Sequence, residues 1–212
     1  MQYTQDPSLV LDALSTRVLG ALSPSAWRKL FLRPHHEVMQ FAPARGTFLC
    51  AAVQVPAWSA GASMLSELSF LAATHGGELD PCPPATALVR FDDAQAALEM
   101  AREMQNMMCD VRFQVGLVSG DCTLASLQLE GRVLRLLAGD AVDRAEAVTR
   151  LAAPGTIRIA PETFALLHED IVGMSHWMVT TEYEGDSMTA ASLTLPPRAN
   201  AHLSTFAGLG LT

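Results

Sequence analysis

The chain has 212 residues, of which 50% are hydrophobic and 17% are charged, a composition typical of one globular domain with or without an appended segment. Its formal net charge of -8 at pH 7 disfavours nucleic acid and anionic membrane surfaces as partners, because both repel an acidic protein. The sequence contains no run of about 18 apolar residues, so it predicts no membrane span, and no signal peptide is recognisable. The four cysteines form no Cys-x-x-Cys pair, so reduced thiols in a cytoplasmic protein are expected.

The first 45 residues are expected to form a helical segment ahead of the main domain, and we call residues 1–45 the lead-in. Asp6-Pro7 and Ser23-Pro24 each combine a helix-capping residue with a proline at the first helical position. Large apolar residues then recur at helical spacing as far as Pro34, namely Leu11, Leu14, Val18, Leu22, Trp27, Leu30 and Phe31. This apolar stripe is expected to pack on the main domain or on another copy of the chain.

The next part of the chain alternates strands and helices. A short apolar run, Phe48–Val55, lies between Gly46 and Pro56 and predicts a buried strand. The helix that follows should end at His75-Gly76-Gly77 and bury Met64, Leu65, Leu68, Leu71 and Ala72. Ala87–Phe91 predicts a further strand. Asp92 is expected to cap a second helix, which should bury Ala97, Met100, Ala101 and Met104.

Beyond residue 110 the pattern predicts a hairpin, two helices and further strands. Alternating apolar residues from Val111 to Leu117 indicate a strand, and Gly120-Asp121 is expected to turn the chain into a partner strand ending near Leu137. A helix should run from Gly139-Asp140 to about residue 152, followed by a strand at residues 156–159. A helix from residue 161 to about 168 and strands near 177–180 and 190–195 complete the domain.

The element order β-α-β-β-α-β-β-α-β-α-β predicts an α+β protein with helices packed on one face of the sheet. A ferredoxin-like βαββαβ core with extensions is the natural choice. We therefore expect a helical lead-in at residues 1–45, a main domain at 46–195 and a flexible tail at 196–212.

Three segments resemble the class III adenylate/guanylate cyclase homology domain. The first is His75-Gly76-Gly77-Glu78, at the end of the first helix of the main domain. The second is the run from Val115 to Asp121, Val-Gly-Leu-Val-Ser-Gly-Asp. The third and strongest is Gly139-Asp140-Ala141-Val142-Asp143, continued by Arg-Leu-Ala-Ala-Pro-Gly-Thr-Ile at residues 150–157. They occur in the order, and on the elements, that the family requires, and the resemblance covers roughly residues 46–170.

The resemblance implies two metal-binding carboxylates, and both are absent. Cyclisation in the family uses two metal ions that activate the ribose 3′-hydroxyl and neutralise the triphosphate. The first aspartate position falls on Val53 and the second on Ala85. Neither side chain offers the oxygen ligand that Mg²⁺ requires, and residues 47–60 contain no Asp or Glu at all.

The remaining family positions have also changed. The base-recognising lysine falls on Pro81, and the second base-selecting position falls on Leu136. The position of the family's asparagine, which orients the ribose, is occupied here by Asp143, which would add negative charge beside a triphosphate. The position of the family's arginine, which stabilises phosphate charge, is occupied here by Ala147. We therefore expect no catalytic residue, no metal site and no cofactor, and the resemblance gives little reason to expect nucleotide binding.

Other chemistry-bearing groups have plainer interpretations. His35-His36 is expected to be a surface pair rather than a metal site. Glu78 and Asp80 flank the altered metal loop and are expected on the surface of an edge strand. The methionines Met100, Met104, Met107 and Met108 with Cys109 suggest core packing, with an adaptable binding surface as the alternative.

The sequence thus favours a catalytically inactive, cyclase-like module for protein interaction or dimerisation in bacterial signal transduction, either as a homodimer or with another protein. One alternative is a sensor of a small molecule or nucleotide, bound in a remnant pocket lined by Val53, Ala85, Leu136 and Ala147. The other is a divergent active cyclase, which would need carboxylates at positions that the alignment does not identify.

Overall fold

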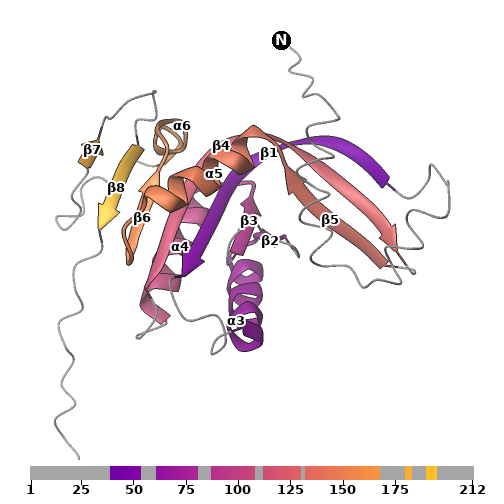
Figure 1. Ribbon diagram of the computed structural model, residues 1–212, viewed down its shortest axis with the longest axis horizontal. Helices are drawn as coiled ribbons and strands as arrows, with labels where there is room; N and C mark the ends of the chain where they lie inside the picture. The colour runs from indigo at the N-terminus through magenta and orange to yellow at the C-terminus, as the bar shows by residue number, and fades with distance from the viewer. Residues whose placement is uncertain are drawn as a thin grey trace, which may run out of the picture.

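The computed structural model describes residues 39–53, 61–80, 87–107, 112–129, 132–167, 180–182 and 190–194. The chain forms one mixed sheet that carries helices on both of its faces (Figure 1). The elements are β1 Met39–Val53, α3 Gly61–Thr74, β2 Glu78–Leu79, β3 Ala87–Phe91, α4 Ala94–Met107, β4 Phe113–Leu129, β5 Arg132–Ala138, α5 Asp140–Leu151, β6 Thr156–Ile159, α6 Pro161–Phe164, β7 Thr180–Glu182 and β8 Ala190–Thr194.

The sheet contains the expected ferredoxin-like core. Its strand order is β2-β3-β1-β4-β6-β8-β7, with β5 paired to β4 beside this path. The first four strands therefore lie as β2-β3-β1-β4, with α3 between β1 and β2 and α4 between β3 and β4 in the chain. This is the βαββαβ arrangement, and the α+β class predicted from the sequence is confirmed.

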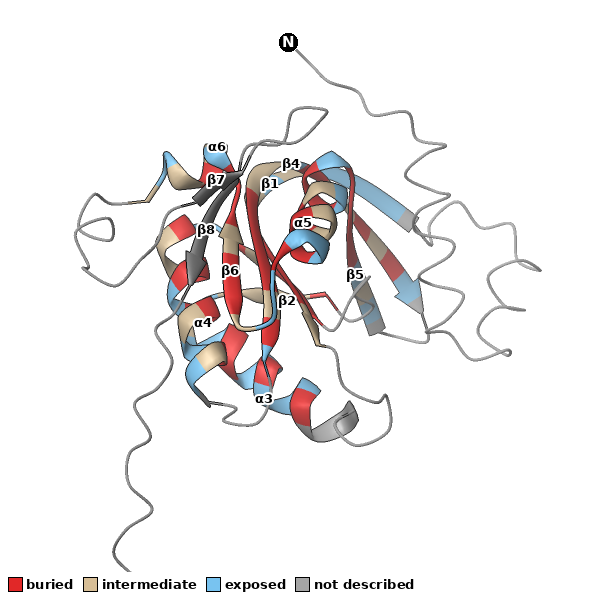
Figure 2. Ribbon diagram, turned by 60° about the vertical axis from the view of Figure 1, so that its left-hand side comes forward, coloured by how far each residue is buried: buried red, intermediate tan, exposed pale blue. Residues whose placement is uncertain are grey.

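Two hydrophobic layers cover the two faces of the sheet. Alternate residues of the central strands, such as Leu49 and Leu117, pack with α3 and α4. Their neighbours, such as Phe48 and Val118, pack with α5. The two helices of the βαββαβ core thus share one face, as expected, but α5 covers the other face, which the one-face prediction missed. Figure 2 shows the buried positions concentrated where the helices meet the central strands.

Strand β1 is longer than the apolar run predicted. It pairs with β4 from Met39↔Leu127 to Val53↔Phe113, so it crosses the expected boundary between residues 45 and 46. Gly46 does not end the strand. A Cβ at that position would lie 2.6 Å from the carbonyl oxygen of Phe91, so the glycine allows β3 to approach. Residues 1–38 of the lead-in lie outside the described residues.

The turn predicted at Gly120-Asp121 is wrong, because β4 runs unbroken through it and the hairpin to β5 falls after Leu129. Gly120 has a different use. A Cβ there would lie 3.1 Å from the Cβ of Ala141, so the missing side chain allows α5 to lie close to β4. The far halves of β1 and β4 and all of β5 form an extension that projects beyond β2 and β3 in Figure 1. We call residues 39–46, 120–129 and 132–138 the arm.

The helices differ from expectation in three details. Leu65 was expected in the core but is 43% exposed, whereas Met64 and Leu68 are buried. The cap of α4 is Asp93, whose carboxylate accepts the backbone N–H groups of Gln95 and Ala96, and not Asp92. Helix α6 ends at Phe164 rather than near residue 168. The predicted buried face of α4, including Met100 and Met104, is confirmed.

Helix α5 lies closest to the sheet at Gly116. A Cβ there would meet the Thr149 hydroxyl at 2.6 Å and the Ala145 carbonyl oxygen at 2.7 Å. The Thr149 hydroxyl also lies 3.0 Å from the carbonyl oxygen of Cys50, to which it donates a hydrogen bond. Backbone atoms of α5 therefore occupy the space that any side chain at position 116 would need.

We predict that Gly116→Ala lowers the free energy of unfolding by about 1–3 kcal/mol, the usual cost of overpacking. Gly120→Ala is the matched control, since its Cβ would meet only a methyl group, at 3.1 Å, and it should cost clearly less. Urea unfolding at constant m-value measures both. Equal losses in the two variants would show that α5 is not pressed against β4 at Gly116.

Candidate functional site

The candidate site is the region where the cyclase-like positions of β2 and β5 meet. Asp80 follows β2 directly and is only 2% exposed, so its expected position on the surface of an edge strand is wrong. Its carboxylate Oδ2 accepts the backbone N–H of Leu137 at 2.8 Å, and its own N–H donates to the Leu88 carbonyl at 2.8 Å. Asp80 thus ties β5 to the β2–β3 hairpin.

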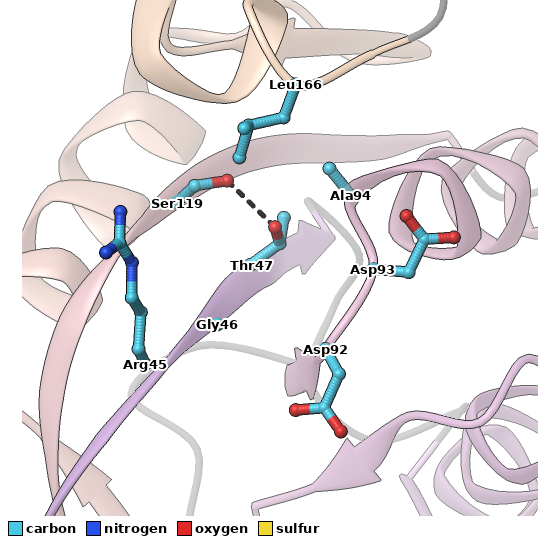
Figure 3. A pocket seen from close by; sticks show the side chains of 8 residues that line it. All are labelled: Arg45, Gly46, Thr47, Asp92, Asp93, Ala94, Ser119 and Leu166. Carbon is cyan, nitrogen blue, oxygen red and sulfur yellow. Dashed lines mark hydrogen bonds between the residues drawn. The ribbon is translucent and has the colours of Figure 1, made fainter.

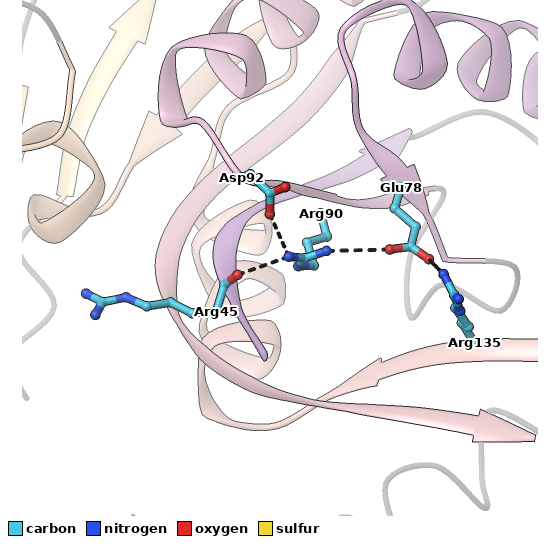
Figure 4. Close-up of polar contacts among 5 residues, drawn as sticks. All are labelled: Arg45, Glu78, Arg90, Asp92 and Arg135. Atoms are coloured by element: carbon cyan, nitrogen blue, oxygen red, sulfur yellow. Dashed lines mark hydrogen bonds and ion pairs between the residues drawn. The ribbon is translucent and has the colours of Figure 1, made fainter. Parts of the chain in front are cut away.

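Glu78, two residues before Asp80, belongs to a network of ion pairs with Arg90, Asp92 and Arg135 (Figure 4). Glu78 lies 3.3 Å from the Arg135 guanidinium and 3.5 Å from that of Arg90. Arg90 in turn lies 2.6 Å from Asp92 and donates to the Arg45 carbonyl at 3.3 Å. Because these groups are partly exposed, each pair adds about 0–1 kcal/mol of stability. Glu78 is therefore neutralised by arginines rather than paired with Asp80 as a metal-binding carboxylate.

Both base-recognition positions are adjacent to this contact. Leu136, the predicted base-selecting position, is 0% exposed and precedes the residue whose N–H Asp80 accepts. Pro81, the position of the base-recognising lysine, follows Asp80 in the chain but lies outside the described residues. The hydrogen bond between Asp80 and Leu137 therefore joins the chain neighbours of Pro81 and Leu136. The resemblance assigned both of these positions to recognition of the nucleotide base.

The other expected pocket residues are distributed over both faces of the sheet. Val53 ends β1 and is half-buried against the layer of α3 and α4. Ala147 is half-buried on α5, and Asp143 is exposed one turn before it. Helix α5 covers the opposite face, so Val53 and Ala147 share no cavity within one chain. Ala85 lies outside the described residues.

Within the described ranges, no group of three or more His, Cys, Asp or Glu side chains is arranged to hold a metal ion. Cys50 and Cys122 are buried thiols. Burial raises the pKa of the Cys122 thiol to about 11, so this thiol stays protonated near neutral pH and is a poor nucleophile. None of the helices that the structure describes is both long and apolar enough to cross a membrane.

A hollow that the sequence did not predict lies near the N-terminus of α4 (Figure 3). Its volume is about 390 Å³, and it is lined by Arg45, Gly46, Thr47, Asp92, Asp93, Ala94, Ser119 and Leu166. The hydroxyl groups of Thr47 and Ser119, on the paired strands β1 and β4, form a hydrogen bond of 2.8 Å at its wall. The lining residues come from four separate parts of the chain, so no local sequence signal could have indicated this hollow.

Comparison with solved structures relates this architecture to nucleotide cyclases. The adenylyl cyclase CyaB from P. aeruginosa is similar with a TM-score of 0.56 and 17% identity, over 77% of this chain and 100% of that chain. The guanylyl cyclase Cya2 gives a TM-score of 0.56 and 15% identity, over 77% of this chain and 98% of that chain. An adenylate/guanylate cyclase/hydrolase from Silicibacter pomeroyi gives a TM-score of 0.53 and 18% identity, over 74% of this chain and 100% of that chain.

No protein-family model matches the sequence, and no curated protein matches it either. At these identities the likeness concerns the fold alone. The chain has the fold of a class III cyclase domain, in agreement with the resemblance seen in its sequence.

We predict that Asp80→Ala lowers the free energy of unfolding by about 1–3 kcal/mol, because a buried backbone donor loses its acceptor. The amide of Leu137 should also exchange its hydrogen faster. The control is Glu78→Ala, which removes only partly exposed ion pairs and should cost less than about 1 kcal/mol. Urea unfolding and hydrogen exchange measure the two effects, and an unchanged Leu137 exchange rate in Asp80→Ala would contradict the assignment.

Proposed function

We propose that this chain is a non-catalytic member of the cyclase-fold proteins that acts by binding a protein partner, foremost a second copy of itself. One observation carries the non-catalytic half of the proposal. Leu136, at the position expected to select the nucleotide base, is apolar and 0% exposed in the single chain. A base can be selected only by groups that it can reach and hydrogen-bond, and this side chain offers neither access nor a polar atom.

The chemistry of the remaining positions supports the same conclusion. Val53 supplies no oxygen ligand for a divalent cation, and Ala147 supplies no guanidinium to stabilise charge on a phosphate. Asp143 is exposed in the first turn of α5, where it would repel a triphosphate. The nearby acidic side chains of Glu78 and Asp80 are already engaged with arginines and a backbone amide.

The binding half of the proposal rests on the surface and on analogy. Helix α3 exposes Leu65 at 43% and Phe70 at 72%, two apolar side chains that a partner could bury. A guanylyl cyclase domain of similar fold, from the RhoGC fusion protein of Blastocladiella emersonii, is described as dimeric (TM-score 0.56, 15% identity, over 74% of this chain and 96% of that chain). We place this module in bacterial cytoplasmic signalling, where a cyclase-like fold without cyclase chemistry can still connect proteins.

We predict that the purified chain forms a dimer as its concentration rises through the micromolar range, and that it forms no cyclic nucleotide. Sedimentation velocity with and without ATP or GTP and Mn²⁺, with product measured in the same samples, tests both parts. The distribution of species should not respond to nucleotide. A monomer at every concentration would contradict self-association. Metal-dependent product that is lost on substitution of one acidic residue would contradict the non-catalytic proposal.

A further inference from the structure

The hollow near the N-terminus of α4 carries opposite charges on opposite sides. Figure 3 shows Arg45 on one side of it and Asp92 and Asp93 on the other. The hydroxyl groups of Thr47 and Ser119 lie between them. The volume of about 390 Å³ is within the usual range of sites that bind small molecules. The hollow is therefore large enough for a small polar ligand that carries both charges.

The two hydroxyl groups leave one hydrogen-bond donor without an acceptor. Thr47 is only 2% exposed, and its hydroxyl lies 2.8 Å from that of Ser119. Each hydroxyl carries one proton, and a hydrogen bond between the two groups uses only one of these protons. Among the residues that the structure describes, neither side chain has another hydrogen-bond partner. The remaining O–H group, at the wall of the hollow, can therefore donate to a ligand oxygen, and leaving it unpaired would be unfavourable.

Arg45 supplies further donors to the hollow. Its guanidinium group lies 3.8 Å from the carboxylate of Asp121, and the two side chains are 82% and 81% exposed, so this ion pair is weak. A guanidinium group presents its N–H donors in a planar fork that matches the two oxygens of a carboxylate. The Arg45 guanidinium and the remaining hydroxyl donor together favour a carboxylate as one end of the ligand.

The other side of the hollow presents acceptors. The two oxygens of Asp93 accept the backbone N–H groups of Gln95 and Ala96 at 3.1 and 3.4 Å, so the protein's own carboxylate already caps α4. Asp92 lies 2.6 Å from the Arg90 guanidinium. Because an ionised carboxylate has about four lone-pair sites, both aspartates can accept further hydrogen bonds. An ammonium group, which has three N–H donors and a positive charge, fits this side.

We propose that the hollow binds a small zwitterion, an amino acid whose carboxylate contacts Arg45 and whose ammonium group contacts Asp92 and Asp93. Ala94 and Leu166 also line the hollow and suit a small apolar side chain on this ligand. A nucleotide fits poorly, because its phosphates would lie close to two carboxylates. The inference is independent of the proposed function, since none of the positions that the resemblance assigned to catalysis or base recognition lines the hollow.

Titration of the isotope-labelled full chain, followed by NMR, tests the site with L-alanine, L-valine and L-leucine as probes. At least one probe should bind saturably with a dissociation constant of about 1 mM or less, and the largest amide shifts should fall in residues 45–47 and 92–94 and at Ser119. No saturable binding of any probe up to about 20 mM, or shifts centred on another region, would overturn the proposal.

Analogues that lack one of the two charges test the zwitterion itself. The decarboxylated amine and the deaminated acid of the tightest probe, which for L-leucine are isoamylamine and isocaproate, should each bind about tenfold more weakly than the amino acid. An amine that binds as tightly as the amino acid would show a site for cations, and an equally tight acid would show a site for anions. Either result would overturn the proposal.

Three variants identify the contacts. Arg45→Gln should weaken binding of the tightest probe about tenfold, because hydrogen bonds to a charged group are lost, and Thr47→Val should weaken it about threefold. The matched control is Arg150→Gln, which removes an exposed arginine that pairs with Glu146 on α5 and should leave binding unchanged. Unchanged binding in Arg45→Gln, or equal losses in Arg45→Gln and Arg150→Gln, would overturn the proposal.

Sedimentation velocity on the same samples separates this inference from the proposed function. A chain that forms dimers but binds none of the three amino acids would refute the zwitterion site and leave the proposed function intact. A chain that binds an amino acid in the hollow but stays monomeric would support the site and contradict self-association.

Discussion

The ladder between β1 and β4 is the contact on which the rest of the structure depends. It joins residues 39–53 to residues 113–127 without a break and carries both helical layers. Helix α5 can lie against it only because Gly116 and Gly120 have no side chain, and the Thr149 hydroxyl adds a hydrogen bond to β1. The same ladder extends past the helices into the arm, which brings β5 to Asp80. The ladder thus supports the close packing of α5 at one end and the candidate site at the other.

Ordinary protein interactions hold the candidate site together. The buried carboxylate of Asp80 holds the β5 backbone, and arginines neutralise its acidic neighbour Glu78. The apolar Leu136, at the position that the resemblance assigns to base selection, is buried. A buried carboxylate that accepted no hydrogen bond would be costly, and the N–H of Leu137 supplies the hydrogen bond that allows Asp80 to lie buried.

Much of the fold followed from local pattern, because period and glycine placement are local properties. The buried face of α4 and the glycine after α3, with a φ of 71° at Gly76, were predicted for this reason. The predictions were wrong where contacts between residues far apart in the sequence determine the local structure. Gly120 resembles a turn residue, yet α5 requires it within a strand, and Leu65 continues the apolar pattern of α3 but remains 43% exposed. The burial of Asp80 depends on a residue 57 positions away. The resemblance assigned Leu136 to base selection, but nothing local in the sequence indicated that this side chain is completely buried.

Calorimetric titration of the full chain with ATP, GTP, cAMP and cGMP, with and without Mn²⁺, tests the central claim most directly. If the base-selecting position is closed and the phosphate and metal groups are absent, none of the four nucleotides should give heat beyond dilution at any metal concentration. Saturable binding of any of them with a stoichiometry near one per chain would show that a nucleotide pocket persists, and it would contradict the account given for Leu136.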